Sequence, residues 1–180
     1  MKKYIHLIPL IIYPYAYIIF FKINFRLDDV STKISDILTD NFFIIVFVYT
    51  LITLMCAILS IVYVIKGKYS VYDVVKMNLI VKSLHIPAYI LHFGMFIYGM
   101  LMSVWGVAFV MVAVIVDVLT IALSGINAIS CAVGLKRQEL LSMKQTIIYV
   151  VASFIFCIDY VVAIIFMFKC KKWIKQGLEL

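Results

Sequence analysis

Long uninterrupted apolar runs constrain this sequence more than any other feature. Residues 42–65 contain no charged side chain, and about 20 apolar residues in a helix span the hydrocarbon core of a bilayer. The runs are continuous rather than alternating, which favours helices over the strands of a membrane barrel. With 66% hydrophobic and 14% charged residues, the chain lies outside the composition of soluble globular, disordered and disulfide-rich proteins. We therefore expect an integral membrane protein.

Five apolar segments predict an all-helical, polytopic bundle that forms one transmembrane domain over residues 1–180. They are residues 4–21, 42–65, 79–101, 104–135 and 146–168. The first is short and holds Pro9 and Pro14, so it can cross or dip into the bilayer and return. The fourth would be about 48 Å long at the helical rise per residue, which predicts a tilt or a projection beyond the membrane, with Gly125 as a candidate bend.

The connections carry helix-start signals. Ser70 with Asp73 and Ser142 with Gln145 each match a capping box, so the third segment should begin as a helix near Val71. Residues 100–103 offer almost no loop, which predicts a tight antiparallel hairpin between the third and fourth segments. Residues 22–41 have the pattern of a short amphipathic segment on the membrane surface, and residues 169–180 form a basic tail.

The charge distribution barely defines an orientation. Five crossings would place eight Lys and Arg residues on the side of the N-terminus and seven on the other side, whereas the positive-inside rule requires a clear excess. We expect the N-terminus inside. The net charge of +7 is explained by juxtamembrane lysines that meet anionic lipid headgroups, so no nucleic-acid partner is expected.

Three segments each carry one polar seam at helical spacing. The seams are Tyr49, Thr53, Cys56, Ser60 and Tyr63; Asn78, Lys82, His85, Tyr89 and His92; and Asp117, Thr120, Ser124, Asn127 and Cys131. Polar groups that face lipid lack partners, so the seams should face the interior of the bundle. For the Ser, Thr and Cys members, close packing and local hydrogen bonds are the favoured interpretation.

Charged side chains within the segments need partners, because an ionisable group near the bilayer centre costs about 2.5–3.5 kcal/mol even on lenient insertion scales. The tight hairpin places residue n of the third segment opposite about residue 204 minus n of the fourth. The same reasoning across the connection at residues 136–145 puts Asp159 near the level of Ala122, and hence of Lys82. This predicts a polar layer in which Lys82 pairs with Asp159 and His85 pairs with Asp117. Lys82 could instead extend along its helix to the interface.

Three interpretations of this layer stay open. It can be a structural network that sets the helix register. It can line a pathway for a small solute, an ion or a proton, or it can belong to an intramembrane enzyme. The candidate ligand or proton pathway consists of Lys82, His85, Tyr89, His92, Asp117 and Asp159. Pro87 predicts a helix kink beside it, with a free carbonyl near Ser83.

Other chemistry has little support in the sequence. His85 and His92 are about 10.5 Å apart along a helix, too far to share a metal ion. The four cysteines include no C-x-x-C pair, and no phosphate-binding, serine-hydrolase or zinc-protease motif is present. We therefore expect no metal, no cofactor and no catalytic residues, and we favour a protein that is not an enzyme.

Residues 78–89, followed by the segment from Asp117 to Lys136 with its Leu-Ser-Gly-Ile-Asn-Ala core, resemble an uncharacterised family of small bacterial multi-pass membrane proteins. The resemblance implies a bacterial cytoplasmic membrane and no particular activity. Two functions follow as hypotheses: a binding or translocation protein for a small solute, ion or proton, and a non-catalytic accessory or immunity-type subunit. The second would bind a protein partner, or further copies of itself, through the basic tail and residues 22–41.

Overall fold

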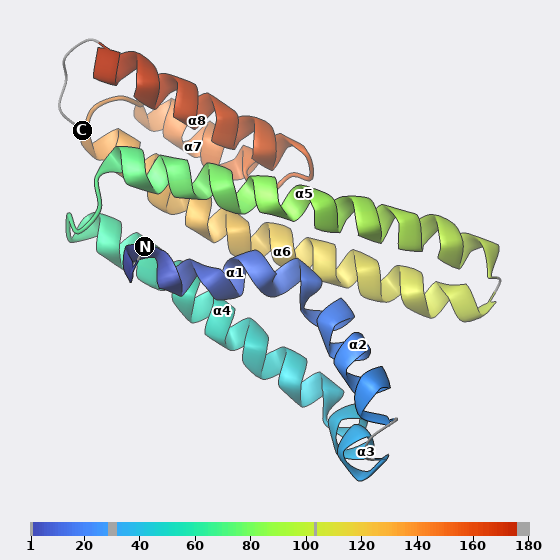
Figure 1. Ribbon diagram of the computed structural model, residues 1–180. Helices are drawn as coiled ribbons and strands as arrows, with labels where there is room; N and C mark the ends of the chain where they lie inside the picture. The colour runs from blue at the N-terminus through green and yellow to red at the C-terminus, as the bar shows by residue number, and fades with distance from the viewer. Residues whose placement is uncertain (1, 29–31, 103, 176–180) are drawn as a thin grey trace.

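The computed structural model describes residues 2–28, 32–102 and 104–175, which form helices and turns with no strand among them (Figure 1). This confirms the all-helical architecture. In chain order the elements are the 3-10 helix η1 (Lys2–Leu7), α1 (Ile8–Ile12), the 3-10 helix η2 (Tyr13–Tyr15), α2 (Ala16–Asp28), α3 (Thr32–Asp40), α4 (Phe42–Ile65), α5 (Val71–Leu101), α6 (Val104–Arg137), α7 (Met143–Ala152) and α8 (Ile158–Lys175).

Three helices are long and apolar enough to cross a membrane: α4, α5 and, within α6, residues Val110–Arg137. Large apolar side chains cover their outer surfaces, with Phe43 at 83%, Phe47 at 63% and Met55 at 64% exposure on α4 alone. A water-soluble monomer rarely exposes apolar patches of this extent, whereas lipid is a suitable solvent for them. The fold therefore defines a membrane protein with three candidate spanning helices.

Helices α5 and α6 form the predicted tight hairpin (Figure 1). They approach closely at Gly99 and Gly106, where a Cβ atom on Gly106 would overlap the carbonyl oxygen of Gly99. Farther along the pair, the Asn127 amide contacts Asn78, and Lys82 contacts Ser124. These pairs lie within about two residues of the register expected from the hairpin, so that estimate is confirmed.

The first apolar segment is not a single helix. It is divided into η1, α1, η2 and the first turns of α2, with Pro9 in α1 and Pro14 in η2. The discontinuous part packs on the bundle through Leu7, Leu10 and Tyr13, which contact Val81 of α5 and Leu123 of α6. Its apolar helical stretch, Ile5–Phe20, is shorter than the three candidate spans.

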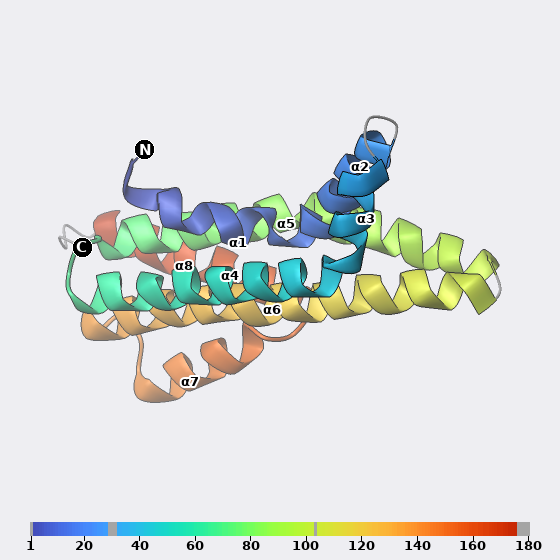
Figure 2. The same ribbon diagram turned by 90° about the horizontal axis from the view of Figure 1, so that it is seen from below.

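The last apolar segment is broken, which corrects the prediction of one helix over residues 146–168. Helix α7 ends at Ala152, α8 begins at Ile158, and Cys157 between them has a φ of 64°. α7 runs toward the middle of the molecule and α8 runs back (Figures 1 and 2). Residues 153–157 contain no Gly or Pro. The sequence signals that usually indicate a turn are therefore absent at this break.

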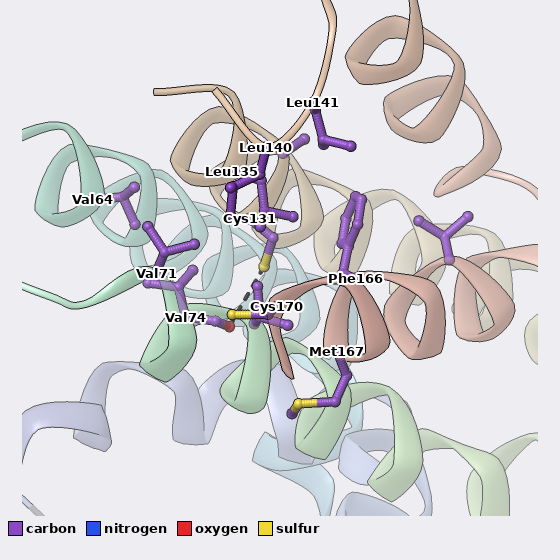
Figure 3. Packing of buried hydrophobic residues seen from close by; sticks show 13 residues of the cluster. Val64, Val71, Val74, Cys131, Leu135, Leu140, Leu141, Phe166, Met167 and Cys170 are labelled. Atoms are coloured by element: carbon purple, nitrogen blue, oxygen red, sulfur yellow. Dashed lines mark hydrogen bonds between the residues drawn. The ribbon is translucent and has the colours of Figure 1, made fainter. Parts of the chain in front are cut away.

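A buried apolar cluster joins α8 to the central hairpin (Figure 3). Phe166 and Cys170 of α8 are fully buried in it, against Val75 of α5 and Cys131 and Leu135 of α6. The Cys131 thiol also donates to the carbonyl of Val74. The second half of α8 therefore lies beside the first turns of α5 and the last turns of α6.

The helix-start signals agree with the structure. The Ser70 hydroxyl accepts the N–H of Asp73 at the start of α5, and Ser142 and Gln145 form a complete capping box at α7. The predicted surface segment, residues 22–41, is not one continuous helix. Its first part, through Asp28, continues α2, and α3 forms the separate short helix; residues 29–31 and the end of the tail, 176–180, lie outside the described residues.

Candidate functional site

A buried ion pair joins α5 to α8. The Lys82 ammonium group lies 2.6 Å from Oδ2 of Asp159 and donates to the Ser124 hydroxyl at 2.7 Å. The other carboxylate oxygen of Asp159 accepts the backbone N–H of Tyr160 at 2.8 Å. Because Lys82 is only 1% exposed, its side chain does not extend to the interface. The predicted pairing of Lys82 with Asp159 is confirmed.

An amide and hydroxyl network lies one turn away, toward the start of α5. The Ser60 hydroxyl donates to Oδ1 of Asn127 at 2.9 Å, and the Asn127 amide nitrogen donates to Oδ1 of Asn78 at 3.2 Å. All three side chains are buried. The network connects α4, α5 and α6, as expected for polar seams that face inward.

The second ion pair differs from the predicted one. His92, not His85, contacts Asp117: Nδ1 of His92 lies against Oδ1 of the carboxylate, and Nε2 lies 3.1 Å from the carbonyl of Pro14. The predicted pairing of His85 with Asp117 is therefore wrong. The hairpin register places Asp117 about five residues, or about 7.5 Å, from the level of His92. The side chains close that distance because each leans toward the start of its own helix.

His85 instead contacts the discontinuous first segment. Its Nε2 lies 3.0 Å from the carbonyl of Leu10. In a regular helix this carbonyl would accept the N–H of residue 14, but Pro14 has none. His85 therefore supplies the donor that the proline removes, and Nε2 must carry the hydrogen because a carbonyl only accepts.

The same reasoning defines the protonation of the His92 and Asp117 pair. Nε2 of His92 faces the Pro14 carbonyl and must carry a hydrogen. A short contact between Nδ1 and Oδ1 then requires one further proton between them, belonging to an imidazolium or to a carboxylic acid. Asp117 is 23% exposed while His92 is 1% exposed, so one partner reaches the surface of the protein and the other does not.

The surroundings of this pair are mainly apolar and aromatic. The Tyr17 ring of α2 lies 5.2 Å from the His92 ring, and the Tyr17 hydroxyl donates to Sδ of Met95 at 3.0 Å. These contacts come from α2 and α5, while the carboxylate comes from α6. Three separate elements thus enclose one protonatable pair.

Tyr89 lies between the two ion pairs along α5. Its ring packs edge-on against Phe156 at 5.2 Å and His85 at 6.3 Å. Among the described residues, the buried Tyr89 hydroxyl and Nδ1 of His85 have no hydrogen-bond partner. Tyr89, a member of the predicted pathway, therefore lies between the two ion pairs without a hydrogen bond to either of them.

Helix α5 is continuous across Pro87. The missing N–H of Pro87 frees the carbonyl of Ser83, and the Tyr15 hydroxyl donates at 2.5 Å to the next carbonyl, that of Leu84. The discontinuous first segment thus contacts α5 close to Pro87, which is itself exposed. Gly125, the other candidate bend, lies within the continuous α6 and packs against the Phe154 ring.

Three hollows lie along these networks. A cavity of about 450 Å³ at the α4–α5 connection is lined by Tyr69, Ser70 and Arg137, and a narrow one of about 10 Å³ adjoins it at Tyr69 and reaches Asn127. An apolar groove of about 360 Å³ lies between α2 and α4 and includes Tyr17 in its wall. The polar seam of α5 thus has a hollow near each of its two ends.

The part of the chain that the structure describes holds no cluster of metal-ligating side chains. There, no three His, Cys, Asp or Glu side chains gather as ligands for an ion. The four cysteines are free, with Cys131 and Cys170 buried.

Sequence reasoning missed the carbonyl acceptors of the first segment. Pro9, Leu10 and Pro14 accept from Tyr49, His85 and His92. A signal for one of them was present, because a proline at position 14 leaves the carbonyl of residue 10 without its helical donor. Comparison of the chain with protein-family models, curated proteins and solved structures finds no match, so the resemblance to small bacterial membrane proteins stays a prediction.

Proposed function

We propose that this protein binds or translocates a small solute in a proton-linked manner, with His92 and Asp117 as the protonatable site. One observation carries the proposal: the Asp117 carboxylate, His92 imidazole and Pro14 carbonyl form a chain from a partly exposed group to a buried one. Ionisable groups within membrane segments commonly mark ion and proton pathways.

The discontinuous first segment supports a binding role. Many membrane transporters form their sites from broken helices, whose free backbone groups contact the substrate or coupling ion. Here the carbonyls of Leu10 and Pro14 are held by His85 and His92. A change in the protonation of His92 alters what its ring can donate, and thereby how firmly η2 is held to α5.

The polar seam of α5 supports a pathway. Asn78, Lys82, His85, Tyr89 and His92 follow one another at intervals of three or four residues, which is about 4.5–6 Å along the helix axis. The Lys82 and Asp159 pair is buried, and Lys82 also donates to Ser124. In this proposal it positions α8 against the seam, while His92 and Asp117 exchange the proton.

Infrared difference spectroscopy of the protein in lipid vesicles, titrated between about pH 5 and pH 8, tests the protonatable site. We expect a carboxyl signal that changes with pH in the wild type and is absent from Asp117→Asn. Asp36→Asn is the matched control, because Asp36 is exposed on α3. A signal that persists unchanged in a folded Asp117→Asn protein would contradict the proposal.

Native mass spectrometry of the gently extracted protein tests the solute. A small molecule or lipid retained by the wild type and lost from Asp117→Asn would support binding at this site. A stoichiometric protein partner with no retained small molecule would contradict it. That result would favour the accessory-subunit hypothesis, with the polar layer as a structural network.

A further inference from the structure

The two ends of the helix bundle differ sharply in charge. One end contains the start of η1, the α4–α5 and α6–α7 connections and the second half of α8 (Figures 1 and 2). Twelve of the 16 Lys and Arg residues belong to this basic end: Lys2, Lys3, Lys66, Lys68, Lys76, Lys136, Arg137, Lys144, Lys169, Lys171, Lys172 and Lys175.

Side-chain contacts bring these distant parts of the chain to the same end. The His6 ring of η1 lies 5.4 Å from the Tyr63 ring and 5.9 Å from the Tyr69 ring, next to the α4–α5 connection. Arg137 donates to the carbonyls of Val64 and Ile65 at the end of α4. The N-terminal segment and the α6–α7 connection therefore adjoin residues 64–70.

Away from the basic end the described residues carry balanced charge. The α5–α6 turn lies at the far end of the hairpin, and the second half of α2, α3 and the start of α4 project to one side of the bundle (Figures 1 and 2). These parts carry Lys22, Arg26 and Lys33 against Asp28, Asp36 and Asp40. The remaining basic residue, Lys82, is buried inside the bundle.

Helix α8 runs from the interior back to the basic end. Asp159, in its first turn, pairs with Lys82, whereas Cys170, eleven residues later, packs in the cluster with Val71 and Val74. The same interval of eleven residues separates Lys82 from Val71 on α5. α8 therefore lies antiparallel to α5 along this stretch and ends at the level where α5 begins.

The turn between α7 and α8 reaches only about half the thickness of a membrane. Phe154 at this turn packs on Gly125 of α6, which is twelve residues, or about 18 Å, from Arg137 at the basic end. The hydrocarbon core is about 30 Å thick. α7 itself has 10 residues and would be about 15 Å long, too short to cross.

We infer that α7 and α8 form a re-entrant hairpin, and that the basic end lies at the cytoplasmic surface, where its lysines bind anionic lipid headgroups. This arrangement removes the ambiguity in the sequence, because a fifth crossing would have moved the lysines of α8 to the other side. Twelve basic residues then lie on the cytoplasmic side and three on the other side. An excess of this size sets the orientation of a membrane protein. Clustered juxtamembrane lysines attract anionic headgroups, which are enriched in the cytoplasmic leaflet.

The cluster around Phe154, Ile155 and Phe156 fits the interior of the bilayer. These consecutive residues are 41%, 47% and 51% exposed at the turn. Ser153, beside them, is buried and donates to the carbonyl of Tyr149, so it does not present a free hydroxyl to lipid. The turn is therefore apolar on its outer face, as a membrane-inserted turn requires.

Single-cysteine labelling tests the topology. In a variant whose four native cysteines are replaced by Ala, one cysteine is introduced at Gln138, Lys171, Met102 or Phe154. Gln138, Lys171 and Met102 are exposed. With a membrane-impermeant maleimide added to intact cells, we expect Met102→Cys to react at once. Gln138→Cys and Lys171→Cys should react only after permeabilisation, and Phe154→Cys should stay unreactive in both conditions.

Each other pattern overturns part or all of the inference. Reaction of Gln138→Cys and Lys171→Cys from opposite sides would show that the segment crosses. Reaction of both from outside, with Met102→Cys protected, would show the reverse orientation. Rapid reaction of Phe154→Cys would place the turn in water. None of these patterns depends on the protonation of Asp117, so the topology and the proposed function can fail independently.

Tryptophan quenching tests the lipid preference. Trp173 lies in α8 at the basic end and Trp105 lies near the start of α6 at the opposite end, which provides an internal control. In phosphatidylcholine vesicles with matched amounts of brominated phosphatidylglycerol or brominated phosphatidylcholine, the Trp105→Phe variant reports on Trp173. We expect quenching of Trp173 by the anionic lipid to be at least about twofold stronger.

The reciprocal Trp173→Phe variant, which reports on Trp105, should show no such preference. Replacing Lys171, Lys172 and Lys175 by Gln should reduce the preference of Trp173. Equal quenching of Trp173 by the two lipids, or an equal preference at Trp105, would overturn the assignment of the basic end as an anionic lipid surface.

Discussion

The Lys82 ammonium group lies 2.6 Å from a carboxylate oxygen of Asp159, and the two side chains are 1% and 2% exposed. Lys82 belongs to the middle of α5, whereas Asp159 is the second residue of α8, just after the backbone reverses at Cys157. The contact therefore fixes the depth at which α8 starts. It also places the negative charge at a helix N-terminus, where the helix dipole stabilises it.

Removing one member of the Lys82 and Asp159 pair should lower the stability of the fold. Lys82→Met or Asp159→Leu alone leaves a buried charged group without its partner, and we expect each to lower the free energy of unfolding by about 3–5 kcal/mol. The double variant Lys82→Met/Asp159→Leu should lose much less, because it leaves no buried charge. Unfolding by SDS in mixed micelles measures these differences.

Lys76→Met is the control for Lys82→Met, because Lys76 is an exposed lysine of the same helix. Its effect should stay within about 0.5 kcal/mol. Additive losses in the Lys82 and Asp159 double variant would mean that the two side chains do not interact in the membrane.

The crossing of α5 and α6 depends on two glycines. A Cβ atom on Gly106 would overlap the backbone of Gly99, so Gly106→Ala must separate the helices or shift their register. We expect a loss of about 1–3 kcal/mol in stability, the range typical of overpacking. A thermal-stability assay in detergent provides the measurement.

Gly94→Ala is a matched control on the same hairpin, because no atom lies within 4 Å of the Cβ position at Gly94. This variant should be neutral or more stable by up to about 1 kcal/mol, since alanine is the better helix former. Equal effects of the two substitutions would argue against the close glycine crossing.

The turn between α7 and α8 should be coupled to α6 through Gly125. A Cβ atom at this position would lie 2.7 Å from Cε1 of the Phe154 ring. Gly125→Ala should therefore lower stability by about 1–3 kcal/mol in the wild type. In a Phe154→Ala background the same substitution should have little effect, because the obstructing ring is absent.

A double-mutant cycle over these variants gives the coupling free energy. A loss from Gly125→Ala of the same size in both backgrounds would mean that the turn does not pack on α6. Labelling of Phe154→Cys would then be expected to change as well, which links this measurement to the topology.

The two buried histidines should differ in their nitrogen NMR signals. The carbonyl of Leu10 requires hydrogen on Nε2 of His85, while Nδ1 has no partner among the described residues. His92 should instead show a strongly hydrogen-bonded Nδ1, because it faces Asp117. Solid-state spectra of ¹⁵N-histidine-labelled protein in lipid distinguish these states.

Asp117→Asn should shift the His92 signals and leave those of His85 unchanged. His85→Gln and His92→Gln provide the assignments. A protonated Nδ1 on His85, or His92 signals that do not respond to Asp117→Asn, would contradict the hydrogen-bond pattern on which the proposed function depends.

Elements with strong local signals could be predicted from the sequence. The apolar run of α4, the cap of α5 at Ser70 and the hairpin between Leu101 and Val104 all match the structure. The pairing of Lys82 with Asp159 could also be predicted, because a buried charge requires a partner of opposite sign. The path that brings Asp159 there could not, because the predicted single helix over residues 146–168 is broken in the structure.

Contacts that depend on a third element could not be predicted. His85 and His92 both had Asp117 within reach by helix register, and the choice between them depends on the carbonyls of Leu10 and Pro14. Those carbonyls come from a segment whose 3-10 turns and path across α5 no local pattern specified. A histidine on a seam has several available partners, and packing selects among them.

The sequence by itself determined that this chain is helical, that it belongs in a membrane and that its polar side chains face inward, because lipid cannot satisfy polar groups. The tertiary structure decided where the backbone breaks. Residues 153–157 are as apolar as the helices beside them, yet the chain reverses there because Asp159 meets Lys82 and Phe154 meets Gly125. Such a reversal rests on contacts between residues distant in sequence, which local composition does not encode.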